Sequence, residues 1–167
     1  MHYSAVNCIM SIMTTFENNK RGKMNKLKIA IGSDHGGFEL KEKIVEYLKS
    51  NNYDYKDFGT FSSDSCDYPK IGKDISLEVA NRSFDRGILV CGSGIGMSIV
   101  ANRYKKVRAA LCWDLTTAKF SRSHNDANIL CLGQRVTDEK LALEMLGVWL
   151  KTEFEGGRHQ TRIDMID

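Results

Sequence analysis

The stretch "VCGSGIGMS" (residues 90–98) joins the end of an apolar run to a turn with three glycines in five positions, and Cys91 stands where the two meet. Apolar residues that lead into a glycine-rich turn and then recur at helical spacing are typical of a strand–loop–helix unit. Backbone N–H groups at the start of such a helix favour an anion or a developing oxyanion. The same groups would lower the pKa of a thiol beside them, so Cys91 is a candidate base or nucleophile.

Other interpretations of the glycine loop remain open at this point. A tight turn from a strand into a helix often needs glycine without binding any ligand. A dinucleotide-binding G-x-G-x-x-G motif would need a glycine at Met97, whereas Gly96 comes one position early and the loop follows the third predicted strand instead of the first. A P-loop is excluded because no Gly-Lys-Ser/Thr follows. Cys112 and Cys131 fall within apolar strand patterns and are predicted to be inert core residues.

Short apolar runs alternate with segments of helical period along the rest of the chain. The alternation occurs five times, which predicts right-handed crossovers and a parallel sheet covered on both faces. We therefore expect an α/β protein with a three-layer α/β/α Rossmann-like fold and a five-stranded parallel sheet. The strands are expected at residues 27–33, 53–59, 86–91, 107–113 and 128–133, and the helices at about residues 40–51, 71–79, 96–103, 115–123 and 138–154.

The length of 167 residues is enough for one domain with a substantial core and too short for two. In residues 1–23 the basic side chains follow the apolar part, which is the opposite of the order in a secretory signal. We predict that residues 1–23 are a poorly ordered extension and that residues 24–167 form a single domain.

Composition excludes several classes of function. The formal net charge is +3, and residues 1–23 carry three basic side chains against one acidic one, so little positive charge remains for the domain. This argues against a nucleic-acid-binding protein, and no apolar run approaches the ~20 residues of a membrane span. The five cysteines are odd in number and form no close metal-type pair. We expect no disulfide framework, no metal site and a cytoplasmic location.

Ligands of parallel sheets bind beside the loops that follow the carboxyl ends of the strands. Asp34, in the first of these loops, could cap a helix, whereas His35 beside two glycines is well placed for a ligand. In the C-terminal stretch "EGGRHQTR" (residues 155–162), Arg158 and Arg162 are four positions apart. They could form a salt-bridged surface pair or hold a phosphate monoester. The loops to compare are residues 33–37, 62–69, 91–96 and 133–135.

Five separate motifs carry a resemblance to a known family. In order and spacing they resemble ribose-5-phosphate isomerase type B, of the family that includes galactose-6-phosphate isomerase subunits. The likeness runs from about Met24 to the end of the chain. The motifs are "GSDHGG" (residues 32–37), "DYP" (67–69), "CGSGIGMSIVAN" (91–102), "SRSHNDANILCLGQR" (121–135) and "EGGRHQTR" (155–162).

The resemblance implies an aldose–ketose isomerase without cofactor or metal that interconverts ribose 5-phosphate and ribulose 5-phosphate, in the non-oxidative pentose phosphate pathway, through an enediolate. It makes Cys91 the base that moves a proton between C2 and C1. The amides of residues 92–96 and the Ser93 hydroxyl would support the enediolate oxygen, and His124 would assist opening of the furanose ring. Some members of the family use a glutamate at the position of Met97 instead, so this chain resembles the cysteine users.

The resemblance also implies a set of substrate-binding residues. Asp34 and Asn125 would hold sugar hydroxyls, while His35 and three arginines would bind the phosphate. The complete set is Asp34, His35, Tyr68, Gly92, Gly94, Ile95, Gly96, Asn125, Arg135, Arg158 and Arg162.

Three alternatives to a ribose 5-phosphate isomerase stay open in the sequence. The substrate could be a six-carbon sugar phosphate such as allose or galactose 6-phosphate. A nucleotide-binding regulatory module would use the glycine loop for a diphosphate and offer Asp114 to a ribose, although the misplaced third glycine counts against it. An inactive subunit of a hetero-oligomer is disfavoured because no expected catalytic position is missing.

The topology predicts how the chain assembles. His124 and Asn125 lie between a helix and the next strand, at the amino-terminal edge of the sheet, whereas Cys91 and His35 lie at the carboxyl edge. A strand of about five residues spans roughly 16 Å, so one subunit cannot easily bring these groups to one sugar. The stretch around His124 could be a mere capping turn. Together with the resemblance, we predict an isologous homodimer with shared sites for a small sugar phosphate, and possibly a dimer of dimers.

Overall fold

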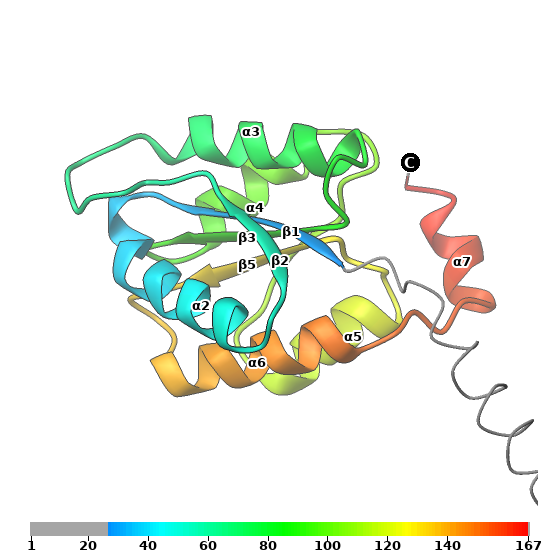
Figure 1. Cartoon of the computed structure of the whole chain (residues 1–167). Helices are drawn as coiled ribbons and strands as arrows, with labels where there is room; N and C mark the ends of the chain where they lie inside the picture. The colour runs from blue at the N-terminus through cyan, green and yellow to red at the C-terminus, as the bar shows by residue number, and fades with distance from the viewer. Residues whose placement is uncertain (1–26, 167) are drawn as a thin grey trace, which may run out of the picture.

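A five-stranded parallel sheet forms the centre of the computed structural model, which describes residues 27–166 (Figure 1). The strand order is β2-β1-β3-β5-β4, and every neighbouring pair is parallel. The expectation of a poorly ordered extension at residues 1–23 lies outside the described residues. The strands are β1 (Lys28–Ser33), β2 (Asp54–Asp57), β3 (Arg86–Cys91), β4 (Ala109–Leu111) and β5 (Ile129–Gly133).

Helices cover both faces of this sheet and confirm the predicted three-layer α/β/α arrangement. In Figure 1, α3 and α4 lie on one face, α2, α5 and α6 lie on the other, and α7 lies beyond the end of the sheet where the strands begin. None of the helices within residues 27–166 is long and apolar enough to cross a membrane. The helices are η1 (His35–Gly37), α2 (Phe38–Ser50), α3 (Tyr68–Ala80), α4 (Ile95–Ala101), α5 (Leu115–Ser123), α6 (Glu139–Lys151) and α7 (Arg158–Ile163).

The two faces of the sheet carry separate hydrophobic cores because side chains alternate along each strand. In β3, Ile88 and Val90 join the core that includes Trp149 of α6, while Leu89 and Cys91 join the core under α3 and α4. Burial on both sides explains why the central strands appear in the sequence as continuous apolar runs. The Cys91 side chain therefore points towards the α3–α4 layer.

The order of the strands changes direction between β1 and β3. From β1 the chain moves outward to β2, then crosses back over β1 to reach β3 on the other side. The loops that leave β1 and β3 therefore diverge at the carboxyl edge, which is the usual ligand position in an open parallel sheet. The loop after β1 contains Asp34 and His35, and the loop after β3 begins at Cys91.

Three elements are shorter by three or more residues than the sequence predicts. β2 covers Asp54–Asp57 and not residues 53–59. β4 covers Ala109–Leu111 and not residues 107–113, because the backbone on either side bonds in turns: the Val107 N–H donates to the Tyr104 carbonyl, and the Trp113 N–H donates to the Thr117 hydroxyl. Asn102 accepts from the Ala109 N–H and donates to the Ala109 carbonyl, both at 2.9 Å. α6 ends at Lys151 and not near Phe154, because Thr152 has an extended backbone.

Candidate active site

The loops that follow β1, β2, β3 and β5 meet at the carboxyl edge of the sheet. The Cys66 N–H donates to Nδ1 of His35 at 3.2 Å, which joins the loops after β1 and β2. A Cβ atom added to Gly36 would lie 3.2 Å from Gly92 N, 3.3 Å from Asp34 Oδ1 and 3.4 Å from Arg135 Nη2. A carboxylate, a guanidinium group and the glycine loop thus surround one small residue.

Close packing accounts for two of the glycines in the loop after β3. Gly94 has φ 77°, and a Cβ there would lie 2.5 Å from Leu111 Cδ1. A Cβ on Gly96 would lie 2.8 Å from the ring of Tyr68. Close packing therefore explains in part why this turn contains glycines, as the alternative interpretation held. The same packing brings the Tyr68 ring directly against the loop.

Cys91 differs from the other buried cysteines in its hydrogen bond from a backbone N–H of the glycine loop. Its side chain is 5% exposed at the end of β3, and the Gly94 N–H donates to Sγ at 3.0 Å. This hydrogen bond holds the sulfur against the start of α4. Burial instead raises the pKa of Cys112 to about 11 and raises the pKa of Cys131 well above its ordinary value. The last two cysteines fit the prediction of inert core residues.

Asp34 is buried near Cys91. Its position before η1 would allow it to cap that helix, but it does not do so. It makes no side-chain hydrogen bond to the start of η1, and its side chain is 8% exposed. Oδ1 is fully buried and receives no hydrogen bond from the described residues. A buried carboxylate oxygen without a donor is costly. A hydroxyl-bearing ligand would supply that donor.

The second group of predicted residues lies at the opposite, amino-terminal edge of the sheet. His124 follows α5 and is stacked between two rings: Phe120 at a centroid distance of 4.5 Å and His159 at 4.3 Å. The Glu155 N–H donates to the Ser123 carbonyl at 3.0 Å, which fastens the C-terminal segment to the end of α5.

The position of α7 divides the predicted phosphate-binding residues between the two edges of the sheet. Arg158 and Arg162 lie on α7, at the amino-terminal edge, whereas His35 and Arg135 follow β1 and β5 at the carboxyl edge (Figure 1). Within one chain the four residues therefore do not form one phosphate site, and the same separation holds between His124 and Cys91. The helical spacing of Arg158 and Arg162 is as expected, because α7 places them one turn apart.

His159, in the motif at residues 155–162, is buried and stacks on His124. Its side chain is on the buried side of α7, and its Nε2 lies 3.8 Å from Glu155 Oε2. Burial is the largest cause that lowers the pKa of His159, and the neighbouring His124 ring adds to it. The arginines of α7 act in the same direction, whereas Glu155 opposes them. The imidazole is therefore neutral at neutral pH.

Phe120 and Glu155 are the site neighbours that the sequence analysis missed. Phe120 lies on α5 four residues before His124, and that helical spacing is the signal that could have revealed it. Glu155 lies in the loop before α7, so its contact with His159 carries no such signal.

The stacked histidines do not fit a metal site in this arrangement. Within residues 27–166, potential ligand atoms of His124, Glu155 and His159 lie within 4.8 Å of one another. A ring nitrogen binds Zn²⁺ in the plane of its ring, at about 2.0–2.1 Å. The two rings are parallel to within 3°, with centroids 4.3 Å apart, so one ion cannot lie in both ring planes.

Asp114 is also occupied in a way that removes it from a nucleotide site. Its Oδ1 accepts from the Thr117 N–H at 2.6 Å and from the Thr117 hydroxyl at 2.9 Å, which caps α5. These hydrogen bonds lower the pKa of Asp114. The carboxylate therefore has a structural role at the start of the helix.

Comparison with known proteins gives a consistent result. A family model described as Ribose/Galactose Isomerase matches residues 29–166. "Ribose-5-P isomerase B" of Listeria innocua is 43% identical over 141 residues, covering 84% of this chain and 95% of the relative. A solved ribose-5-phosphate isomerase B of Clostridium thermocellum has a TM-score of 0.83 and 50% identity, covering 84% of this chain and 95% of that chain. "D-erythrulose-4-phosphate isomerase" of Pectobacterium atrosepticum is 38% identical over 141 residues, covering 84% and 93%.

Proposed function

Because the chain belongs to the Ribose/Galactose Isomerase family and is an aldose–ketose isomerase of sugar phosphates, we propose that it interconverts D-ribose 5-phosphate and D-ribulose 5-phosphate. The observation that carries the proposal is the group at the carboxyl edge. There Cys91, with a hydrogen bond to its sulfur, begins the glycine loop that lies beside Gly36 together with Asp34 Oδ1, which has no partner, and the Arg135 guanidinium. The free cysteines also fit a reducing compartment, and we propose a cytoplasmic location.

The proposed reaction needs one base and one set of oxyanion donors. The Cys91 thiolate removes the C2 proton of the open-chain aldose and leaves an enediolate, whose oxygen is held by N–H groups of residues 92–96 and by the Ser93 hydroxyl. A proton moves from O2 to O1, and the Cys91 thiol returns its proton to C1. The product is the ketose, and the thiolate is regenerated, so protons and charge balance.

The remaining groups of the proposed site bind the sugar phosphate. The Asp34 carboxylate accepts from a sugar hydroxyl, and Tyr68 and Ile95 border the loop beside it. His35 and Arg135 bind the phosphate from the carboxyl edge, with charge-assisted hydrogen bonds from the guanidinium. His124 assists ring opening and Asn125 holds a second hydroxyl.

Assembly into a homodimer brings the two groups together in this proposal. β3 has six residues, and a strand rises ~3.3 Å per residue, so the two edges are roughly 20 Å apart. The two edges cannot act on one five-carbon sugar within one chain. We therefore place His124, Asn125, Arg158 and Arg162 of one subunit against Cys91 of the other.

Kinetics on sugars of different length test the substrate. We expect kcat/KM to be highest for ribose 5-phosphate, compared with allose 6-phosphate, galactose 6-phosphate and erythrose 4-phosphate. The four-carbon sugar is included because one relative is named for a four-carbon ketose phosphate. A higher kcat/KM for a six-carbon or a four-carbon sugar would assign the chain to that substrate instead.

A further inference from the structure

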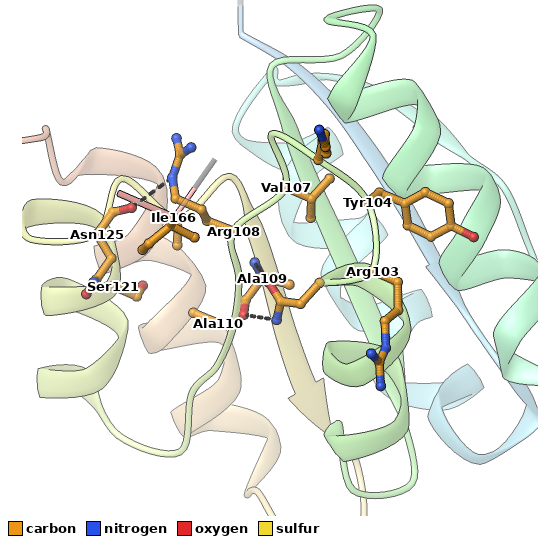
Figure 2. Close-up of a pocket in the computed structure, with 12 residues that line it drawn as sticks. Arg103, Tyr104, Val107, Arg108, Ala109, Ala110, Ser121, Asn125 and Ile166 are labelled. Atoms are coloured by element: carbon orange, nitrogen blue, oxygen red, sulfur yellow. Dashed lines mark hydrogen bonds between the residues drawn. The ribbon is translucent and has the colours of Figure 1, made fainter. Parts of the chain in front are cut away.

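Arg108 holds the turn that carries His124 and Asn125, although it comes from another part of the chain. It lies just before β4, and its Nε donates to the Asn125 carbonyl at 3.0 Å and to the Asp126 carbonyl at 3.2 Å. Its Nη2 donates to the Asp126 carbonyl at 3.1 Å and to Asp126 Oδ2 at 3.0 Å. Figure 2 shows the Arg108 side chain reaching the Asn125 backbone.

A second guanidinium group holds the same turn from the side of the core. Nη1 of Arg122 donates to Asp126 Oδ1 and to the Ala127 carbonyl, both at 2.7 Å. Arg122 is 2% exposed and lies over the ring of Trp149. The Asp126 carboxylate therefore bridges two arginines, one fixed in the core and one next to the edge strand.

The turn needs this support because its backbone is irregular and one side of it is open. Asp126 has φ 45°, in the left-handed region that is unfavourable for residues other than glycine. A hollow of about 540 Å³ lies beside the turn, and both Arg108 and Asn125 line it (Figure 2). Hydrogen bonds from Arg108, more than apolar packing, thus fix the carbonyls of the turn on this side.

We propose that Arg108 is a positioning residue for the reaction, acting through the backbone of Asn125 and Asp126 on the orientation of His124 and Asn125. The inference rests on the proposed function, because it assigns the His124 turn to the sugar. Arg108 itself binds backbone carbonyls one and two residues beyond His124, and its role is to keep that imidazole and the Asn125 amide in one geometry. Catalytic groups need such support, since small displacements are costly in rate.

Substitution of Arg108 tests the proposal kinetically. Arg108→Lys keeps the charge but loses the planar fork that contacts two carbonyls and a carboxylate at once. We expect kcat to fall on the order of tenfold to a hundredfold in this variant and in Arg108→Ala, with a smaller rise in KM because Asn125 also holds a sugar hydroxyl in the proposed site. Added guanidinium ion should restore part of the kcat of Arg108→Ala and have no such effect on Arg108→Lys. Wild-type kcat in either variant would overturn the proposal.

Arg103→Ala is the matched control. Arg103 is an exposed arginine that lines the same hollow, so its removal changes the local charge equally without touching the turn. We expect wild-type kcat and KM for this variant. An equal loss of kcat in Arg103→Ala and Arg108→Ala would show a general effect of charge and would overturn the positioning role.

Histidine NMR separates this proposal from the proposed function. In protein labelled with ¹⁵N-histidine, Arg108→Lys should shift the ring signals of His124 and His159 and leave those of His35 unchanged. If the wild-type protein turns over no sugar phosphate but these shifts occur, the proposed function fails, and what stands is that Arg108 fixes the turn of His124 and Asn125. Unchanged His124 signals would overturn the positioning role whatever the activity, and Arg108→Lys decides the question if Arg108→Ala does not fold.

Discussion

The two edges of the sheet are built in different ways. At the carboxyl edge, short loops follow the buried strands β1 and β3, and the Gly94 N–H bonds to Cys91 within three residues of chain. At the amino-terminal edge, His124 stacks on His159 of α7, and Arg108 from outside α5 holds the turn that follows His124. The first region is local and close to the core, whereas the second is assembled from distant segments.

This difference indicates a division of labour in the proposed site. A base must be held rigidly against its oxyanion donors, and the loop after β3 supplies both from adjacent residues. In this proposal His124 and the two arginines of α7 belong to a region beyond the end of the sheet (Figure 1), where a second subunit can use them. Substitution of the base at the carboxyl edge should therefore abolish catalysis. Substitutions at the other edge should weaken substrate binding or disturb the orientation of the catalytic groups.

The largest expected effect comes from the base. Cys91→Ala should lower kcat by about 10²- to 10⁴-fold, the usual contribution of a positioned general base, while the Kd for ribose 5-phosphate stays close to that of the wild type. Steady-state kinetics and calorimetric titration measure the two quantities. Cys112→Ala is the control, since this buried thiol has a raised pKa and no assigned role. Near-normal turnover by Cys91→Ala would remove it as the base.

Substitution of one glycine near each edge of the sheet tests how tightly the two edges are packed. Gly94→Ala should destabilise the protein by roughly 2–5 kcal/mol, because a left-handed backbone costs about 1–2 kcal/mol and the new methyl group clashes with Leu111. Gly156, with φ 66°, has no atom within 4 Å of an added Cβ, so Gly156→Ala should cost only about 1–2 kcal/mol. Urea unfolding measures both. Equal losses would contradict the difference in packing.

Arg162 tests the role of α7 in binding. Loss of charge-assisted hydrogen bonds worth about 1.5–3 kcal/mol should raise KM by roughly 10- to 150-fold in Arg162→Ala, with a smaller change in kcat. Thr161→Ala, an exposed neighbour on the same helix, should keep the wild-type KM. An unchanged KM in Arg162→Ala would exclude Arg162 from the site.

The smallest expected effect is a dependence of stability on pH. The pKa of His159 is lower in the folded chain than its ordinary value of 6.5, so the unfolded chain binds the proton more readily. The contribution to stability is therefore present above about pH 6.5 and is lost as the pH falls towards the folded pKa. Melting temperatures across this range should fall less in His159→Gln than in the wild type. Parallel curves would show that His159 does not contribute.

Much of the fold could be predicted because the central strands are short apolar runs with clear ends. The predicted third strand matches β3 (Arg86–Cys91), and the predicted fourth helix matches α5 (Leu115–Ser123). The ends of β4 and α6 could not be predicted, since they depend on turn hydrogen bonds of Val107 and Trp113 and on the extended backbone of Thr152.

The composition of each edge could be inferred from topology, but its contacts could not. The positions of Cys91 and His124 relative to the predicted strands were enough to predict that they lie at opposite edges of the sheet. The docking of the C-terminal segment onto α5 rests on one backbone hydrogen bond from Glu155 to Ser123 and on a ring stack, and both join segments far apart in sequence. Periodicity carries no information about such contacts.

Subunit mixing tests the shared site most directly. Cys91→Ala and His124→Ala homodimers, each impaired alone, are dissociated, mixed and reassociated, and hybrid formation is verified by mass spectrometry. A hybrid has one site with both changes and one with neither, so random mixing should restore about a quarter of wild-type activity. If verified hybrids stay as inactive as the two parents, each site belongs to a single subunit and the shared-site account is wrong.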